Sequence, residues 1–490
     1  MSTRRTRRRF LAAAAGSAAG FTILSSAKSV RAAPANDRLR LAVFGTMYNA
    51  EHFLTAAHTH NAQIVAVCNA DGRKLSGTIG RWTKQAENLA KSSNALQQQA
   101  AEGYRRLAGL QDVKTFEDVR QMFSELSGGI DALVVSDYDH FHGVACSAAM
   151  RQGVHVCSER PIGMNIQDAR SLRALAEKTK VATTYRSPGT GTGEFRRAIE
   201  LVEAGAIGPV KEVHVWFKRG GADRREPPQG GQPVPPGLNW DVWLGPLPER
   251  DYHPDWMAYS NWRESCNGGL GVFGMHTSIF HFVTLRLREL WEDDREQNQI
   301  RVTAECSGLN LLSFPRWERV RWDVPARGDL PPVAIHWHYG PEFAPGAREL
   351  IHGKLRSFGI NSEQEADDLM KTAGSILIGS DGALVGDDHT VRVTALPREK
   401  FQGIETKRPQ RVTPSEGIYN DWIKACRGGV PQILANFDNG SKLSEFIMLG
   451  NIATQYPGQT ITYAPKAGKI VTPIEANQKL GFKYRDGWTL

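Results

Sequence analysis

The sequence predicts an α/β protein in which an N-terminal doubly wound parallel sheet precedes a second, α+β domain with an open, mainly antiparallel sheet. Three observations predict it. Short apolar runs alternate with helix-like stretches over residues 39–185, which is typical of a parallel sheet covered by helices. Beyond residue 210, strand-like runs alternate in polarity. The 490 residues, 41% of them hydrophobic, exceed a single small module and exclude a disordered chain.

The first 35 residues resemble an export signal. Five arginines crowd positions 4–9, a mildly apolar run follows over 10–24, and small-residue cleavage patterns end the segment. The string Thr6-Arg7-Arg8-Arg9-Phe10-Leu11 is similar to the twin-arginine signal. The apolar run is too short and Gly-rich to span a bilayer stably. We therefore expect a signal over 1–35 and a periplasmic or secreted protein without a stable membrane span after processing. The alternatives are an uncleaved anchor and a basic tail.

This segment also explains the net charge of +8. It holds seven of the 60 basic residues and no acidic one, so 53 basic and 52 acidic residues remain after it. A nearly neutral mature chain gives no reason to expect a nucleic-acid partner. The six cysteines lie far apart without a CxxC pair, which favours buried free thiols over a zinc ribbon, although an oxidising compartment would allow one or two disulfides.

The predicted first domain covers residues 36–187. Its strands and helices alternate along the chain, a pattern typical of a dinucleotide-binding Rossmann fold. The expected strands cover 39–44, 62–68, 130–136, 154–157 and 181–185, and the expected helices cover 50–57, 143–152 and 165–178, with a polar helical excursion over 75–110.

The predicted second domain covers residues 188–490. A Gly/Thr/Pro loop leads into it, and Pro/Gly-rich stretches over 221–238 predict large loops. The expected elements are a helix over 194–204, a strand over 210–217, antiparallel strands within 333–339 and 376–385, and a helix over 279–285.

The turn after the first strand is a candidate phosphate-binding loop. A GxGxxG turn lets backbone approach a pyrophosphate, but here Met47 replaces the central glycine, while Ala50 is acceptable at the third position. Asn69 stands where an acidic residue would hold ribose hydroxyls, with Asp71 nearby. The candidate cofactor residues after the first two predicted strands are Gly45, Thr46, Met47, Tyr48, Asn49, Asn69 and Asp71. A Rossmann fold that has lost nucleotide binding remains the alternative.

Polar residues also follow two later strands. Carboxyl ends of parallel strands meet at one edge, where ligands bind in open α/β sheets. Further candidate cofactor residues are therefore Asp137, Asp139, His140, His142, Glu159 and Arg160. A capped helix start with exposed histidines and an ordinary surface ion pair are the structural alternatives.

Two further histidine groups lie in the second half. A glycine-rich approach, residues 268–274, leads to His276 at the expected start of an apolar helix, where a histidine can transfer protons or serve a purely structural role. His336 and His338 share one face of a strand, but a metal site would need further ligands, so no metal is predicted.

Together these strings resemble the Gfo/Idh/MocA family of oxidoreductases, over nearly all of residues 38–490. The matching strings are Leu41–Gly45 with His52, Asp139-His140-Phe141-His142, Glu159-Arg160-Pro161, Asn239–Pro246, Trp422–Cys426 and Asn436-Phe437-Asp438. The resemblance implies a Rossmann domain followed by a sheet domain often used for oligomerisation. It also implies NAD or NADP between the domains and a sugar or polyol substrate, with the lysine of an "EKP" motif and a downstream Asp/His pair handling the alcohol proton.

The sequence departs from this family at several site positions. Arg160 replaces the "EKP" lysine, and Val272 and Ile279 replace polar residues around His276. Arginine stays protonated, so Arg160 cannot be a general base but can hold a substrate oxygen. Arg160 and His276 are therefore the candidate catalytic residues.

These departures leave two functions open. The first is an exported NAD(P)-dependent oxidoreductase, for which the resemblance implies homo-oligomers. Its cofactor would be tightly bound and recycled internally, because the periplasm has no comparable nicotinamide pool. The second is a catalytically decayed carbohydrate-binding or scaffold protein on the same fold.

Overall fold

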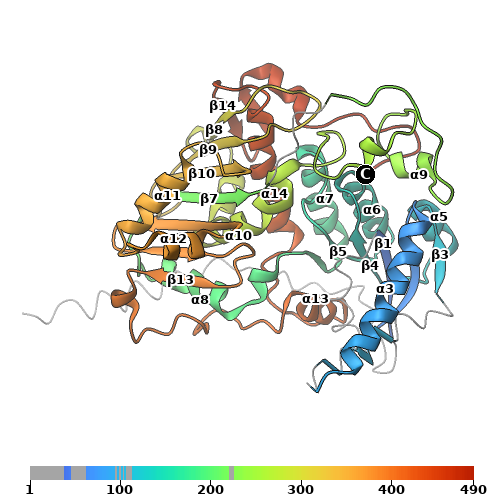
Figure 1. Ribbon diagram of the computed structural model, residues 1–490, viewed down its shortest axis with the longest axis horizontal. Coiled ribbons are helices and arrows are strands. Elements are labelled where there is room, and N and C mark those ends of the chain that lie inside the picture. Colours follow the sequence, from blue (N-terminus) through green and yellow to red (C-terminus); the bar gives the residue numbers. More distant parts are fainter. Residues whose placement is uncertain are drawn as a thin grey trace, which may run out of the picture. The chain divides into compact units, whose positions relative to one another are not determined.

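The computed structural model describes residues 38–45, 62–93, 97–98, 101–102, 104–105, 113–219 and 226–490 (Figure 1). The expected export signal, the turn residues 46–49 and the expected helix over 50–57 lie outside this part of the chain. No helix in the described ranges is both long and apolar enough to cross a lipid bilayer. All six cysteines are described and carry free thiols; five are buried and Cys306 is half-buried.

The first sheet has six parallel strands in the order β3-β2-β1-β4-β5-β6. The order reverses between β1 and β4, as in dinucleotide-binding folds, so the predicted class of this half is confirmed. The strands are β1 (Leu39–Gly45), β2 (Ala62–Cys68), β3 (Lys114–Phe116), β4 (Ala132–Ser136), β5 (His155–Ser158) and β6 (Thr183–Tyr185).

The helices of this half begin where polar side chains cap them. Asp71, Asp118 and Asn165 each accept a hydrogen bond from a backbone amide of the first helical turn, which satisfies a donor that has no partner within the helix. The helices are α3 (Gly72–Ala90), α5 (Val119–Glu125), α6 (Asp139–Arg151) and α7 (Ile166–Thr179). Helix α6 begins four residues before the expected start at residue 143.

The second sheet has nine strands in the order β13-β12-β11-β7-β10-β9-β8-β14-β15. Strands β7 and β10 pair in parallel, and the other pairs are antiparallel, as the sequence predicted for most of this sheet. The strands are β7 (Val210–Lys218), β8 (Ile300–Cys306), β9 (Glu318–Val324), β10 (Val333–Gly340), β11 (Ala373–Gly379), β12 (Ala383–Gly386), β13 (Val393–Leu396), β14 (Ile461–Ala464) and β15 (Lys469–Thr472).

Helices α10 and α14 lie between the two sheets, and α11 and α12 lie on the far side of the second sheet (Figure 1). The helices of this half are α8 (Gly193–Glu203), α9 (Trp240–Leu244), α10 (Met275–Thr284), α11 (Ala347–Arg356), α12 (Glu363–Met370), α13 (Ile418–Cys426) and α14 (Phe437–Ala453). A π-helical turn, η3 (Leu270–Gly274), precedes α10. The 3-10 segments are η1 (Pro188–Gly191), η2 (Pro254–Met257), η4 (Leu287–Trp291), η5 (Glu296–Asn298), η6 (Arg398–Phe401) and η7 (Ile474–Lys479).

A buried carboxylate on α14 joins the two halves. Glu445 has no exposed surface and accepts hydrogen bonds from Arg170 (2.9 Å) and Arg173 (3.0 Å) of α7. The indole of Trp291 (2.9 Å) and the hydroxyl of Tyr463 (2.7 Å) donate to it from the second half. Charged groups this deeply buried persist only when they are paired and hydrogen-bonded, as Glu445 is.

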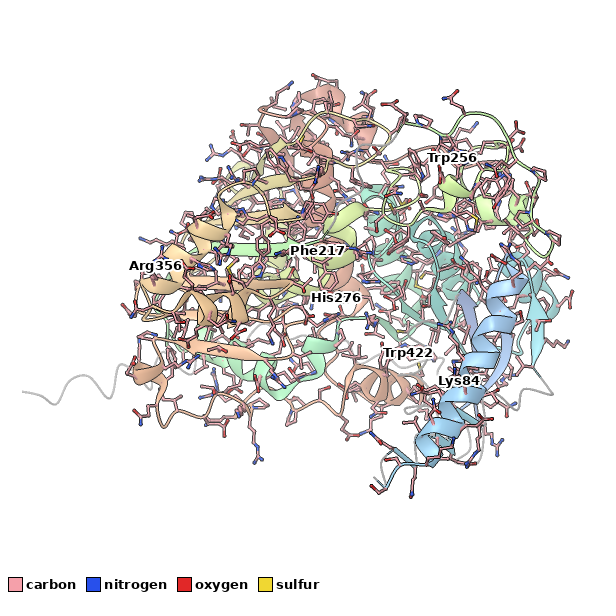
Figure 2. The ribbon with its side chains drawn as sticks, viewed as in Figure 1. Lys84, Phe217, Trp256, His276, Arg356 and Trp422 are labelled. Atoms are coloured by element: carbon pink, nitrogen blue, oxygen red, sulfur yellow. The ribbon has the colours of Figure 1, made fainter. Side chains whose placement is uncertain are left out.

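The C-terminal part of the chain returns to the first sheet on both of its faces. In α13, the indole of Trp422 donates to the carbonyl of Ala182, 3.2 Å away (Figure 2). On the other face the backbone amide of Gln167 donates to the carbonyl of Leu480 (2.9 Å), and Trp488 packs against Phe141 with ring centroids 6.1 Å apart. The core of the first half therefore includes residues from the end of the chain.

Candidate active site

The carboxyl ends of β1, β4 and β5 meet at one edge of the first sheet. Gly45 pairs in register with Ser136, and Val135 pairs with Ser158. The predicted residues Asp137 and Glu159 directly follow these strand ends. The structure therefore brings the described candidate residues from three strands to the edge where such sheets bind ligands.

Gly45 lies so close to the neighbouring strand that no side chain fits. Its φ is +112°, a backbone conformation that favours glycine, and an added Cβ would lie 2.1 Å from the carbonyl oxygen of Ser136. The sequence therefore needs glycine here whatever the turn binds. The next predicted cofactor residues, Thr46, Met47, Tyr48 and Asn49, lie outside the described residues.

Asn69 ends β2 with an unused donor. Its Oδ1 accepts from the backbone amide of Asp71 (2.8 Å), but its buried Nδ2 has no hydrogen-bond partner among the described residues. An orphaned buried amide donor at this strand end fits a ribose hydroxyl of a dinucleotide. Asp71 has a different role, because it caps α3 and forms an ion pair with Arg73 (2.8 Å).

A tryptophan-rich segment covers this strand end. The backbone amides of Gly72 and Asn239 bind the carbonyls of Gly237 (2.9 Å) and Ala70 (2.8 Å), so residues 237–239 pair with the chain after β2. Trp240 and Trp243 stack with ring centroids 4.8 Å apart. Residues 237 and 238 end the Pro/Gly-rich stretch that was predicted as loop, and the two tryptophans follow it within the string Asn239–Pro246.

His140 and His142 are buried and hold backbone segments together. The ring nitrogens of His140 lie 3.0 Å from the carbonyl oxygen of Trp243 and 3.4 Å from that of Ser265. Those of His142 lie 2.8 Å from the Pro161 carbonyl and 3.0 Å from that of Asp137. Burial lowers the pKa of His140 to about 4, so its ring is neutral at pH 7. Cofactor contact by these two side chains remains a prediction.

Arg160 lies at the end of β5 in a charged cluster. Its guanidinium donates to Glu159 (2.8 Å) and to the backbone carbonyl of Val272 (3.2 Å). Arg186 lies 3.8 Å from the other Glu159 oxygen. Burial acts to lower the pKa of Arg160, but the nearby acidic groups Glu159, Tyr259 and Asp139 outweigh it and raise the pKa. Arg160 is therefore a fixed cation.

Asp139 connects this cluster with Tyr259. It has no exposed surface; one oxygen accepts from the Tyr259 hydroxyl (3.2 Å) and the other from the backbone amide of Asn267 (2.9 Å). Tyr259 keeps 39% of its surface exposed, yet desolvation and the Asp139 carboxylate raise the pKa of its hydroxyl, so it stays protonated. Arg160, Asp139 and Tyr259 together place a tyrosine hydroxyl beside a cation and a carboxylate.

His276 does not open a helix as the sequence predicted. The π-helical turn η3 runs directly into α10, so His276 lies within a longer helical segment. The glycines before it allow close packing instead: a Cβ on Gly269 would lie 2.7 Å from the ring of Tyr339, and one on Gly271 would lie 2.3 Å from Cβ of Asn267. Tertiary packing therefore explains the glycine run.

The His276 side chain is fully buried between the sheets (Figure 2). Both ring nitrogens are buried and have no hydrogen-bond partner among the described residues. Burial, and then the charge of Arg160, lower the pKa of His276 well below its usual value. The ring of His389 lies 4.7 Å from it, and Nδ1 of His389 is 3.0 Å from Asp388. A partly exposed His–Asp pair thus contacts His276.

The other histidine pair is part of a stack. His336 and His338 share a face, as predicted, with rings 6.2 Å apart, and His214 of the parallel strand β7 stacks on both. His214 lies 3.1 Å from His338 and 2.8 Å from Glu212. No group of three His, Cys, Asp or Glu side chains in the described part of the chain has the geometry to hold a metal ion.

A comparison with models of known families decides the class of the first sheet. Residues 39–186 match the Gfo/Idh/MocA model, described as an oxidoreductase family with an NAD-binding Rossmann fold. Residues 39–186 belong to the Gfo/Idh/MocA family. The match covers the strand ends described above, from Gly45 to Arg186.

Two curated proteins resemble parts of the chain. An uncharacterized Bacillus subtilis oxidoreductase, YfiI, is 28% identical over 117 residues, which are 23% of this chain and 29% of that protein. An uncharacterized oxidoreductase from Schizosaccharomyces pombe, C115.03, is 29% identical over 90 residues, which are 18% of this chain and 24% of that protein. The matched region is thus less than a third of either relative.

Solved structures share the fold over most of both chains. The WlbA dehydrogenase of Bordetella pertussis, in complex with NADH and UDP-GlcNAcA, superposes with a TM-score of 0.52 at 12% identity, covering 87% of this chain and 99% of that one. An oxidoreductase from Thermotoga maritima superposes with a TM-score of 0.51 at 15% identity, covering 87% of this chain and 100% of that one. GenD2 of gentamicin A biosynthesis, in complex with NAD, superposes with a TM-score of 0.51 at 15% sequence identity, covering 89% of this chain and 99% of that one. At these identities the likeness shows the fold alone.

The departures from the Gfo/Idh/MocA motifs are accommodated in the structure. Arg160 occupies the position of the motif lysine, and Val272 offers it a backbone carbonyl where the family pattern has an acidic side chain. Ile279 is fully buried in the main hydrophobic core. The region around His276 has therefore become more apolar than the family pattern implies.

Sequence analysis missed three residues of the site. Tyr259 lies in a loop without strand or helix periodicity, and Arg186 follows the short strand β6. His389 follows two aspartates after β12, where a polar cluster at a strand end was the available signal. The contacts of Tyr259 with Asp139 and of His389 with His276 join segments more than 100 residues apart, whereas Arg186 approaches Glu159 from the end of the neighbouring strand.

Proposed function

We propose that the protein is an exported NAD(P)-dependent oxidoreductase that acts on a carbinol carbon of a sugar, polyol or glycoside. One observation carries this proposal. Gly45 and the Arg160–Asp139–Tyr259 group both lie at the carboxyl edge of a Gfo/Idh/MocA Rossmann sheet. Dinucleotides bind at this edge, and a substrate hydroxyl needs a cation and a proton partner there.

The described residues fit a dinucleotide. Gly45 lets the backbone pass close to β4, and the buried Nδ2 of Asn69 has no hydrogen-bond partner within the described ranges. Bound NAD or NADP would supply the hydride acceptor. The side chains that follow β4 and β5, among them Asp137 and Glu159, would then border the reacting end.

The roles of the candidate catalytic residues follow from their charge states. Arg160 cannot accept a proton, so it would hold and polarise the substrate oxygen. Tyr259 would supply the hydroxyl, and its hydrogen bond to Asp139 gives its proton a route to a carboxylate. His276 is buried and neutral, so it would contact the substrate only through one of its ring nitrogens, neither of which has a hydrogen-bond partner among the described residues. The ring of His389 packs against it.

The proposed location requires a retained cofactor. The twin-arginine-like signal would direct a folded protein to a compartment that offers no comparable nicotinamide pool. Tight binding and internal recycling, between two sugars or within one redox-neutral reaction, would meet this requirement. We also propose that the protein forms homo-oligomers, which light scattering would test.

The test is to purify the protein from the periplasm, denature it and assay the supernatant for nicotinamide nucleotide. We expect about one nucleotide per chain. Protein that carries none and also fails to bind added NAD or NADP would contradict the proposal. Cytoplasmic protein purified with the signal removed is the matched control for the location.

A second candidate is a non-catalytic carbohydrate-binding or scaffold protein. The observation that favours it is that Arg160 is already occupied by Glu159 and the Val272 carbonyl, while His276 is fully buried. Sugar binding without nucleotide and without turnover would support this candidate.

A further inference from the structure

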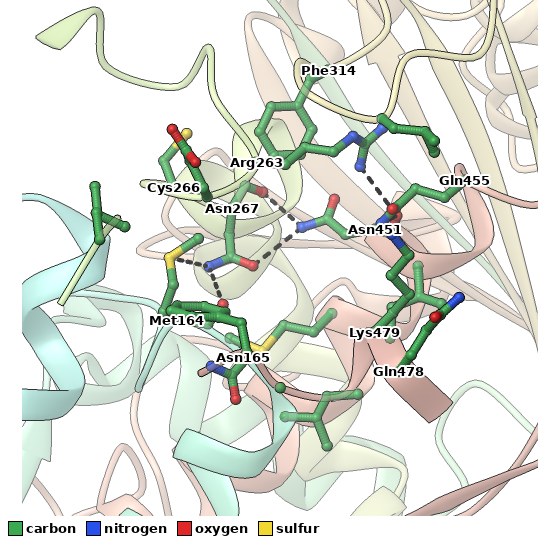
Figure 3. Close-up of a pocket in the computed structure, with 18 of the residues that line it drawn as sticks. Met164, Asn165, Arg263, Cys266, Asn267, Phe314, Asn451, Gln455, Gln478 and Lys479 are labelled. Carbon is green, nitrogen blue, oxygen red and sulfur yellow. Dashed lines mark hydrogen bonds between the residues drawn. The ribbon is translucent and has the colours of Figure 1, made fainter. Parts of the chain in front are cut away.

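A cavity of about 350 Å³ lies outside the candidate active site (Figure 3). Neither Arg160 nor His276 lines it. Its walls come from six segments: residues 164–166, 247–248, 263–267, 311–314, 448–455 and 478–483. Segments far apart in sequence thus form one concave site.

Amide side chains form one wall of this cavity. Nδ2 of Asn267 donates to the Met164 carbonyl (3.2 Å), and Nδ2 of Asn451 donates to the Asn267 carbonyl (2.9 Å). One amide atom remains: Oδ1 of Asn451 is buried and has no hydrogen-bond partner among the described residues, and Asn451 is only 7% exposed. Buried polar atoms without partners are rare, so an acceptor is available for a polar ligand.

The charge of the cavity is positive. Arg263 lies with its guanidinium 4.6 Å from the ring of Phe314 and donates to neutral acceptors, among them the Asn451 carbonyl (3.2 Å). Within the described ranges Arg263, Lys479 and Lys483 form no ion pair, and the lining carboxylate, Glu264, is paired with Arg250. An anionic group would compensate this charge.

Apolar side chains complete the lining. Leu311 and Phe482 are 54% and 38% exposed, and Phe314 and Ile452 also line the cavity. Pockets that combine apolar surface with a few placed polar groups bind small molecules. A pyranose ring has both features, since its C–H faces are apolar and its hydroxyls both donate and accept.

We propose that this cavity is a second binding site, for a monosaccharide unit that carries a carboxylate. A sugar hydroxyl would donate to Oδ1 of Asn451, and the carboxylate would lie near Arg263, Lys479 and Lys483. The backbone amide of Asn267, at the cavity wall, donates to Asp139 of the candidate active site. The two sites therefore lie on opposite sides of one short segment, but binding at the second site does not depend on redox chemistry.

The test is calorimetry of the full chain with D-glucuronate, and with D-glucose and inorganic phosphate as comparison ligands. We expect glucuronate to bind at least tenfold more tightly than either. The Lys479→Gln/Lys483→Gln double variant removes two charges without breaking an ion pair and should weaken glucuronate binding at least tenfold. Lys211→Gln, an exposed lysine of β7, is the control and should leave binding unchanged.

Binding at the candidate active site would give a different pattern. Tyr259→Phe should leave glucuronate affinity unchanged if the second site holds the sugar. Loss of binding in Tyr259→Phe but not in the double lysine variant would overturn the proposal, as would equal affinity for glucose or for phosphate, or no binding of glucuronate at all. None of these outcomes bears on nucleotide release, which tests the proposed function separately.

Discussion

Replacing Glu445 by Gln should destabilise the whole protein. The substitution keeps the shape of the side chain but removes a charge that two arginines of α7 and two donors of the second half share. Removing one partner from a buried ion pair costs about 3 to 5 kcal/mol. Because Arg170 and Arg173 are 26% and 20% exposed, water compensates them in part, and we expect about 3 kcal/mol, at the lower end of that range.

The assay is urea unfolding followed by tryptophan fluorescence, since Trp291 contacts Glu445 directly. Lys442→Gln is the matched control on the same helix: its partner Asp438 is 49% exposed, so its loss should cost below about 1 kcal/mol. If Glu445→Gln changed the free energy of unfolding by no more than the control does, the argument that this carboxylate joins the two halves would be wrong.

Three further predictions concern the strand edge, the buried histidines and the proposed proton route. Gly45→Ala should cost about 3 kcal/mol or more, because its Cβ would overlap the Ser136 carbonyl, and a melting temperature within about 1 °C of wild type, roughly the shift that a 1 kcal/mol change gives in a protein of this size, would refute the close approach. His140 and His281, whose pKa values burial lowers to about 4 and about 3, stay neutral when folded but take up protons when unfolded, so each should contribute about 2 kcal/mol less stability at pH 5 than above pH 6.5. Glu318 and Asp168, whose pKa values burial raises to about 7 and about 6, act in the opposite direction over this range, so the measurement is the difference in melting temperature between wild type and His281→Gln at pH 7.5 and at pH 5. A difference that does not change between these pH values would contradict the prediction. Tyr259→Phe should lower kcat at least tenfold with little change in KM, whereas unchanged turnover in His276→Ala would remove His276 from proton transfer.

The sequence predicted the first sheet well because its central strands are continuous apolar runs. Strand β3 was missed because it has three residues, two of them exposed, and so no apolar run. The parallel pairing of β7 with β10 was also missed, since register between strands over 100 residues apart leaves no local signal. Local pattern defines strands, whereas tertiary packing selects their partners.

The candidate site was predicted less completely, for a related reason. The strand ends at Gly45 and Glu159 follow from the alternation of strands and helices, so the edge could be found. What each side chain does there depends on neighbours from other segments. His142 bridges two carbonyls, and Tyr259 reaches Asp139 from a loop 120 residues away. Neither contact could be predicted from spacing.

The return of α13 and the C-terminal tail to the first sheet bears on how the protein is synthesised. Trp422 and Trp488 complete cores whose first strand begins at Leu39, so the N-terminal half cannot finish packing while the ribosome is still translating the second half. Native structure should therefore form only after release of the full chain, and nascent chains stalled before residue 480 should remain open to protease and to chaperones.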